Sequence, residues 1–129
     1  MGAAAQLHPL VRRLLTEHRL ATLETVGDVA GVEGPLLLFL PGYAKAHVET
    51  ADVAVILPEL LAVFGGRLGA AVAGPDLETA LRSELGLALP ALVMVRQGRP
   101  VGSIARVRDW RDYLDRVAAL LDAPPALVS

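Results

Sequence analysis

The chain contains no cysteine, and this absence excludes a whole class of chemistry. Thiol–disulfide exchange needs a thiolate nucleophile, and structural disulfides and thiolate metal sites need the same side chain. None of these can form in this protein.

The sequence also lacks an excess of basic residues and any long apolar run. Its 12 basic and 14 acidic residues leave a net charge of −2, whereas a protein that binds nucleic acid through phosphates concentrates basic residues on one face. No apolar run reaches the length of a membrane span, and Met1–Gln6 lacks the basic and apolar regions of a signal peptide. We therefore expect a cytoplasmic protein that neither binds nucleic acid nor inserts into a membrane.

The 129 residues are 53% hydrophobic, which is enough apolar surface for one packed core. We expect a single domain over residues 1–122. The stretch Ala123-Pro124-Pro125-Ala126 opens a tail at 123–129 that we expect to be frayed.

Apolar residues recur at helical spacing in some segments and form short runs bounded by glycine or proline in others. The run Pro35–Leu40 is typical of a central strand that is buried on both faces. Pro58 interrupts a helical pattern and predicts a kink near Ala54. The full prediction is helices at 7–18, 51–64, 75–85 and 109–121, strands at 20–24, 35–40, 67–73, 91–96 and 101–107, and an irregular stretch with a turn or two of helix at 25–34.

The segment 87–102 predicts a terminal β-hairpin. Pro90 stands just before an apolar strand, Gln97-Gly98 supplies a tight turn, and Pro100 opens the second strand. Proline is tolerated at the first residue of a strand or at an edge, so both prolines fit this interpretation.

No motif for metal, phosphate or hydrolytic chemistry is present. The serines lack a nucleophile-elbow context, and Gly65–Gly69 is not followed by Gly-Lys-Ser/Thr, so a helix-to-strand turn accounts for these glycines. The three histidines have no ligand spacing: His8, His18 and His47. The sequence predicts no metal site, no cofactor and no catalytic residue.

The order of elements resembles the thioredoxin superfamily. In that fold a cis-proline precedes the penultimate strand, which Pro90 matches, and a proline lies in the helix after the central strand, which Pro58 matches. The resemblance implies a three-layer α/β/α sandwich with a mixed central sheet and a C-terminal antiparallel hairpin. It also puts Thr50-Ala51-Asp52-Val53 where the redox cysteines would be.

In this fold the loop after the central strand, the start of the next helix and the residue before the cis-proline share one surface. We expect Tyr43, Val53 and Leu89 to form a small apolar patch there. Glu49 and Asp52, with Glu24 or Glu33 nearby, would form an acidic rim around this surface that suits a basic peptide. Two plainer interpretations stay open: Asp52 caps its helix, and Tyr43 packs on its own loop. The predicted partner-binding residues are Tyr43, Glu49, Thr50, Asp52, Val53, Leu89 and Pro90.

Among cysteine-free thioredoxin-like families, the chain resembles the hydrogenase expression proteins of the HupG/HyaE type over about its first 120 residues. The matching segments are His8-Pro9-Leu10, Leu36–Gly42, Leu57-Pro58-Glu59-Leu60 and Leu89–Val93. The resemblance implies a non-catalytic accessory chaperone in [NiFe]-hydrogenase maturation. Its partner would be the small-subunit precursor, which carries a twin-arginine signal peptide.

Two other classes of function remain open. An enzyme would need Thr50 as nucleophile, and the sequence shows no base for it. A redox-inactive scaffold or oligomerisation module would pair with a neighbouring molecule through the edge strand 101–107. Pro100, Arg106 and Arg108 partly disfavour such pairing.

The missing thiolate gives a first testable prediction. The purified protein should not reduce the disulfides of insulin above the uncatalysed rate, because it has no group that can form a mixed disulfide. A turbidity assay with dithiothreitol and a thioredoxin control measures this. Catalysis by uncontaminated protein would contradict it.

Overall fold

Strand β2 (Leu36–Leu40), a run of five apolar residues, forms the centre of the protein. The structure is a computed structural model in which residues 8–43 and 48–122 are described. Leu7, His47 and the predicted tail at 123–129 lie outside these residues.

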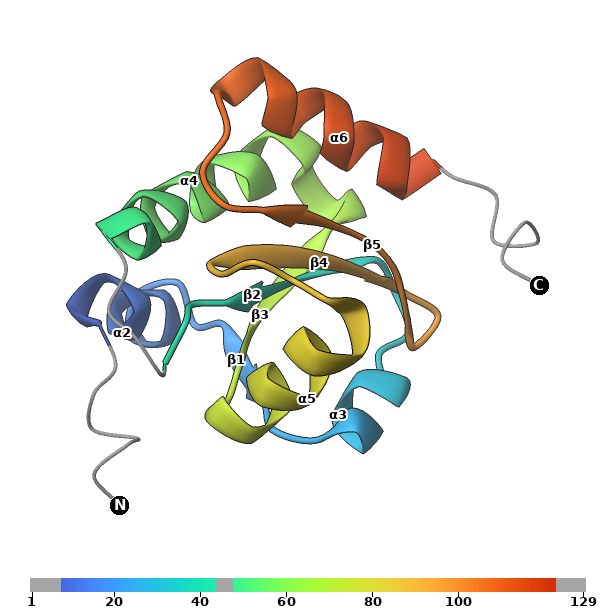
Figure 1. Ribbon diagram of the computed structural model, residues 1–129. Coiled ribbons are helices and arrows are strands. Elements are labelled where there is room, and N and C mark those ends of the chain that lie inside the picture. Colours follow the sequence, from blue (N-terminus) through green and yellow to red (C-terminus); the bar gives the residue numbers. More distant parts are fainter. Residues whose placement is uncertain (1–7, 44–47, 123–129) are drawn as a thin grey trace.

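Within the described residues, five strands form one mixed sheet in the order β1-β3-β2-β4-β5 (Figure 1). Strands β1, β3 and β2 are parallel, whereas β4 runs antiparallel to both β2 and β5. The elements are α2 (Pro9–Thr16), β1 (Ala21–Leu23), α3 (Val26–Ala30), β2, α4 (Val48–Phe64), the 3-10 turn η1 (Gly65–Arg67), β3 (Gly69–Ala73), α5 (Pro75–Leu85), β4 (Ala91–Arg96), β5 (Arg99–Ala105) and α6 (Trp110–Asp122).

Helices cover both faces of the sheet, which gives the predicted three layers (Figure 1). Alternation along β2 sends Leu37 and Phe39 to a cluster with α2, α4 and α6, and sends Leu38 and Leu40 to a cluster with α3 and α5. All four side chains are fully buried, and burial of each contributes about 1.5–3 kcal/mol. The continuous apolar run of β2 therefore reflects two packed faces.

The helix boundaries follow from local chemistry. His8 accepts the Leu10 N–H at the start of α2, and Thr25 forms a capping box with Asp28 at α3. Gly86 takes the left-handed conformation that ends α5. The predicted first helix ends two residues too late, because the chain reverses after Glu17 with Arg19 at a φ of 57°.

The C-terminal hairpin is confirmed, with β4 and β5 joined at Gln97-Gly98. The strand pairing shifts between Met94 and Val95, where β5 carries one extra residue. The Leu89–Pro90 peptide bond before β4 is cis. Strand β5 ends at Ala105 and not at Val107 as predicted, because Arg106 has a φ of 67° and its N–H bonds to the Pro90 carbonyl.

Helix α4 begins at Val48, three residues before the predicted start at Ala51. It contains Pro58 within its 17 residues. The earlier start makes Glu49 the acidic residue of the first turn and moves Asp52 beyond that turn. The interpretation of Asp52 as a helix cap is therefore wrong, because the free N–H groups lie one turn before it.

The hairpin turn gives a prediction about packing. Gly98 has a φ of 77°, and a Cβ at this position would lie 2.5 Å from the Ala30 carbonyl oxygen of α3. Gly98→Ala should therefore lower the free energy of unfolding by about 1–3 kcal/mol, through backbone strain and steric clash. Urea denaturation measures the change.

Gly34→Ala is the matched control, because an added Cβ there meets nothing within 4 Å. It should change stability by less than about 0.5 kcal/mol. Equal stability of the two variants would contradict the close approach of the hairpin turn to α3.

Candidate functional site

A buried carboxylate organises the loop that follows the central strand. Glu78 lies in the first turn of α5 and is only 3% exposed. Its two oxygens accept the backbone N–H groups of Gly42 and Tyr43, at 2.7 and 2.8 Å. Burial of a charge is unfavourable unless hydrogen bonds replace its water, and these two bonds do so.

Two more side chains hold the same loop. The Tyr43 hydroxyl donates to the Ala73 carbonyl at the end of β3, at 2.7 Å, and the Thr50 hydroxyl donates to the Pro41 carbonyl at 2.7 Å. Burial, together with the nearby Glu78 charge, raises the pKa of Tyr43 to about 12. The segment Pro41–Tyr43 is thus fastened to β3, α4 and α5, and Tyr43 packs against neighbouring elements.

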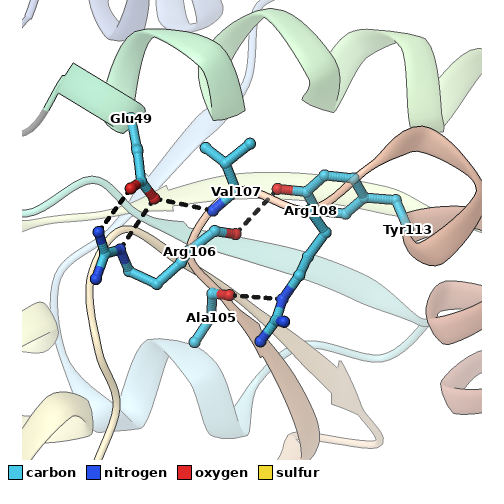
Figure 2. Close-up of polar contacts among 6 residues, drawn as sticks. All are labelled: Glu49, Ala105, Arg106, Val107, Arg108 and Tyr113. Carbon is cyan, nitrogen blue, oxygen red and sulfur yellow. Dashed lines mark hydrogen bonds and ion pairs between the residues drawn. The ribbon is translucent and has the colours of Figure 1, made fainter.

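A second group of polar contacts joins the start of α4 to the loop after β5. Figure 2 shows Arg106 facing Glu49, with Nε–Oε1 and Nη2–Oε2 distances of 2.9 and 2.6 Å. The Val107 N–H also donates to Glu49 Oε1, and the Tyr113 hydroxyl donates to the Arg106 carbonyl. The Glu49 carboxylate raises the pKa of the Arg106 guanidinium, mainly through their hydrogen bond.

Arg106 also links two predicted site residues. Its backbone N–H donates to the carbonyl of the buried Pro90 at 2.7 Å, and its side chain binds Glu49. Because a guanidinium already faces Glu49, this residue adds little net negative charge to the surface. The predicted acidic rim therefore carries less net negative charge than its number of acidic residues suggests.

The predicted apolar patch of Tyr43, Val53 and Leu89 does not form. Val53 is 1% exposed and belongs to the core beneath α4, whereas Leu89 packs with the cluster on the α3 and α5 side of the sheet. Thr50 and Pro90 are buried as well. The prediction failed because the exposure of a helical residue depends on which side of the helix meets the sheet.

Two acidic neighbours were proposed for the same surface. Glu33 precedes β2, whereas Tyr43 follows it, so the length of the strand separates them by about 17 Å. Glu33 is therefore not part of the rim. Glu24 follows β1, which is parallel to β3 and β2, and so lies at the same end of the sheet as Tyr43.

Of the predicted residues, Asp52 presents the clearest charge to solvent. It is exposed on α4 and makes no ion pair with another residue in the described part of the chain. The most important polar residues in this region, Glu78 and Arg106, were missed as site residues. An acidic residue in the first turn of a helix is favoured by the helix dipole alone, so Glu78 gave no sign of burial, and Arg106 was expected only to hinder pairing at the sheet edge.

Little in this arrangement supports covalent chemistry. The Thr50 hydroxyl is buried and donates its proton to a carbonyl, which cannot activate it as a nucleophile. Within residues 8–43 and 48–122, no group of three or more His, Asp or Glu side chains could hold a metal ion. Among the same residues, no helix is long and apolar enough to cross a membrane.

The Glu78 interaction predicts a stability effect. Glu78→Gln should lower the free energy of unfolding by about 1.5–3 kcal/mol, because an amide keeps one acceptor but places a donor against the second N–H. Glu84→Gln, on the exposed face of the same helix, is the control and should change stability by less than about 0.5 kcal/mol. Urea denaturation of both variants measures the difference.

The tyrosine titration gives a second readout of the same substitution. Burial and the Glu78 charge both disfavour the Tyr43 phenolate. In the folded protein Tyr43 should therefore stay mostly protonated at pH 10, where an ordinary tyrosine is half ionised. In Glu78→Gln the pKa should fall but stay above 10, because the larger cause, burial, remains. Absorbance near the phenolate band measures this, and an unchanged titration would contradict the contact.

Comparison with known proteins places the chain in a family. A family model described as hydrogenase-1 expression protein HyaE matches residues 10–113. The hydrogenase expression/formation protein HupG of Bradyrhizobium diazoefficiens is 40% identical over 119 residues, covering 91% of this chain and 80% of that protein. HoxO of Azotobacter vinelandii, also described as a hydrogenase expression/formation protein, is 38% identical over 118 residues, covering 89% and 79%.

A solved structure agrees with these matches. The crystal structure of a hydrogenase expression/formation protein HupG from Rhodopseudomonas palustris CGA009 has a TM-score of 0.51 and 34% sequence identity. The match covers 81% of this chain and 99% of that one. The chain therefore belongs to the HyaE family of hydrogenase expression proteins.

Proposed function

We propose that this protein is a non-catalytic accessory chaperone of [NiFe]-hydrogenase maturation. It binds the precursor of the small subunit, together with its twin-arginine signal peptide, before export. The observation that carries the proposal is family membership over most of the chain, with relatives described as hydrogenase expression/formation proteins. A role in hydrogenase maturation follows from membership of the family.

The chemistry at the former redox position supports a binding role. Thioredoxin-like enzymes act there through cysteines, and this chain has none. Thr50 and Val53, two of the four residues at that position, are buried and serve the core and the loop. Of these four residues, a partner can therefore contact chiefly Asp52, which is exposed.

The charge of this surface supports the choice of partner. An exposed carboxylate attracts a guanidinium and can hydrogen-bond it in a bidentate manner. Asp52 is available for such a contact, whereas Glu49 already binds Arg106. Tyr43 is half-buried, so part of its ring can meet the apolar residues of a bound segment.

A redox-inactive scaffold remains the second candidate, because β5 lies at an edge of the described sheet. Pro100 within β5 and the pairing irregularity beside it both disfavour the addition of another strand. We therefore rank this function below the chaperone role.

The chaperone proposal predicts salt-dependent binding. The probe is a synthetic twin-arginine signal peptide of the hydrogenase small subunit from the same genome. Asp52→Lys should weaken its affinity about threefold to tenfold at about 50 mM salt, and much less at about 500 mM, because salt screens exposed charges. Isothermal titration calorimetry measures both conditions, with Glu84→Lys on α5 as the matched control.

Tyr43→Ala should weaken the same peptide at every salt concentration, because an apolar contact is not screened. Tyr43→Phe keeps the ring and controls for the lost hydrogen bond to Ala73. Circular dichroism checks that each variant is folded. The proposal fails if the wild-type protein does not bind the peptide, and unchanged affinity in both Asp52→Lys and Tyr43→Ala would place the site elsewhere.

A further inference from the structure

The composition of α4 does not match its position at the surface. Its few charged residues are all acidic, and most of the others are apolar. A helix that is apolar on all sides is typical of a protein interior. Yet α4 lies in an outer layer of the fold (Figure 1) and buries one side, which includes Val53, Ala54, Leu57 and Leu60.

The opposite side of α4 forms a continuous surface. Five residues of the helix are exposed, and at 3.6 residues per turn they fall within an arc of about 100°. They are Asp52, Val55, Glu59, Ala62 and Val63, which we call the α4 outer stripe. Val55 and Val63 are each 55% exposed.

The stability of the fold does not explain this stripe. Valine is a weaker helix former than alanine or the long polar residues, so an exposed valine neither fills the core nor favours the helix. Asp52 and Glu59 lie about 10 Å apart along the axis and form no ion pair with another described residue. The stripe thus offers two apolar contacts and two carboxylates that have no cation beside them among the described residues.

We infer that the α4 outer stripe binds the apolar part of the signal segment in helical form. Val55 and Val63 supply the apolar contacts, and Asp52 and Glu59 meet the basic residues of the segment. This inference rests on the proposed function, and it adds the surface used and the conformation of the bound segment.

The helical form follows from the backbone of α4. Apart from the Ala54 carbonyl, whose intrahelical donor Pro58 removes, its internal N–H and C=O groups bond within the helix, so they cannot pair with an extended peptide. The backbone of a segment against this surface loses water on the side that faces α4, and an α-helix satisfies those groups internally. Two facing helices also match the spacing of three and four residues that separates the members of the stripe.

The charge of the stripe argues against a second copy of this chain as its occupant. In a two-fold dimer the same surface meets itself, so the carboxylates of Asp52 and Glu59 on one copy would meet the carboxylates on the other. Like charges brought together across an interface are unfavourable, whereas a segment with basic residues is complementary.

Removal of the apolar contacts tests the inference. The double variant V55S/V63S should bind the signal peptide about tenfold more weakly at both low and high salt, because it loses apolar area in the complex. Serine and valine have similar helix propensities, so α4 should remain folded. Val26→Ser is the matched control, because Val26 is 57% exposed on α3, beyond the sheet from α4.

Removal of the carboxylates tests whether Asp52 and Glu59 contact the basic residues of the segment. The double variant D52N/E59Q should weaken binding about threefold to tenfold at about 50 mM salt and little at about 500 mM. Glu84→Gln is the control for loss of an exposed charge. Circular dichroism of the peptide, after subtraction of the protein signal, should show a gain of helix on binding to the wild type and a smaller gain with V55S/V63S.

The outcomes separate the two proposals. If the wild-type protein does not bind the peptide, both the proposed function and this inference are wrong. If the wild type binds but V55S/V63S retains full affinity, the stripe is not the site and the chaperone role stands. If sedimentation shows a wild-type dimer that V55S/V63S abolishes, the stripe is a self-association surface and the inference is overturned.

Discussion

The burial of the Glu78 carboxylate is the constraint on which the rest of this region depends. A charge that is almost fully removed from water needs strong donors, and the amides of Gly42 and Tyr43 provide them. These donors come from the end of the central strand, and the acceptor comes from the start of α5. The direction in which the chain leaves β2 towards α4 is therefore fixed by an interaction outside both elements.

The same surface shows how a thioredoxin-like arrangement can persist without thiols. Thr50, which the thioredoxin resemblance puts at the redox position, donates to the Pro41 carbonyl, and Glu49 beside it binds the guanidinium of Arg106. Both residues hold loops in place through these bonds. These contacts give a stable frame, and under the proposed function binding rests on the side chains that this frame leaves exposed, including those of α4.

The sequence predicted elements better than it predicted the site. Periodicity located the five strands and the four longer helices to within about three residues, because the core positions of this fold repeat with the period of each element. Two element ends were wrong where a non-glycine residue adopts a positive φ, at Arg19 and Arg106, since arginine gives no turn signal. The predicted apolar patch failed because Val53 and Leu89 pack on opposite faces of the sheet, and sheet faces are not apparent from local spacing.

By itself, the sequence determined that no thiol chemistry is possible, that β2 is buried on both faces, and that the chain ends its sheet in a hairpin. Each of these follows from residue identity or from a pattern within a few residues. Only the tertiary structure decided that Glu78 binds Gly42, 36 residues away, and that Arg106 binds Glu49, 57 residues away. It also decided that Asp52 and Val55 face solvent while Val53 does not, because exposure depends on how α4 packs against the sheet and not on the order of residues within it.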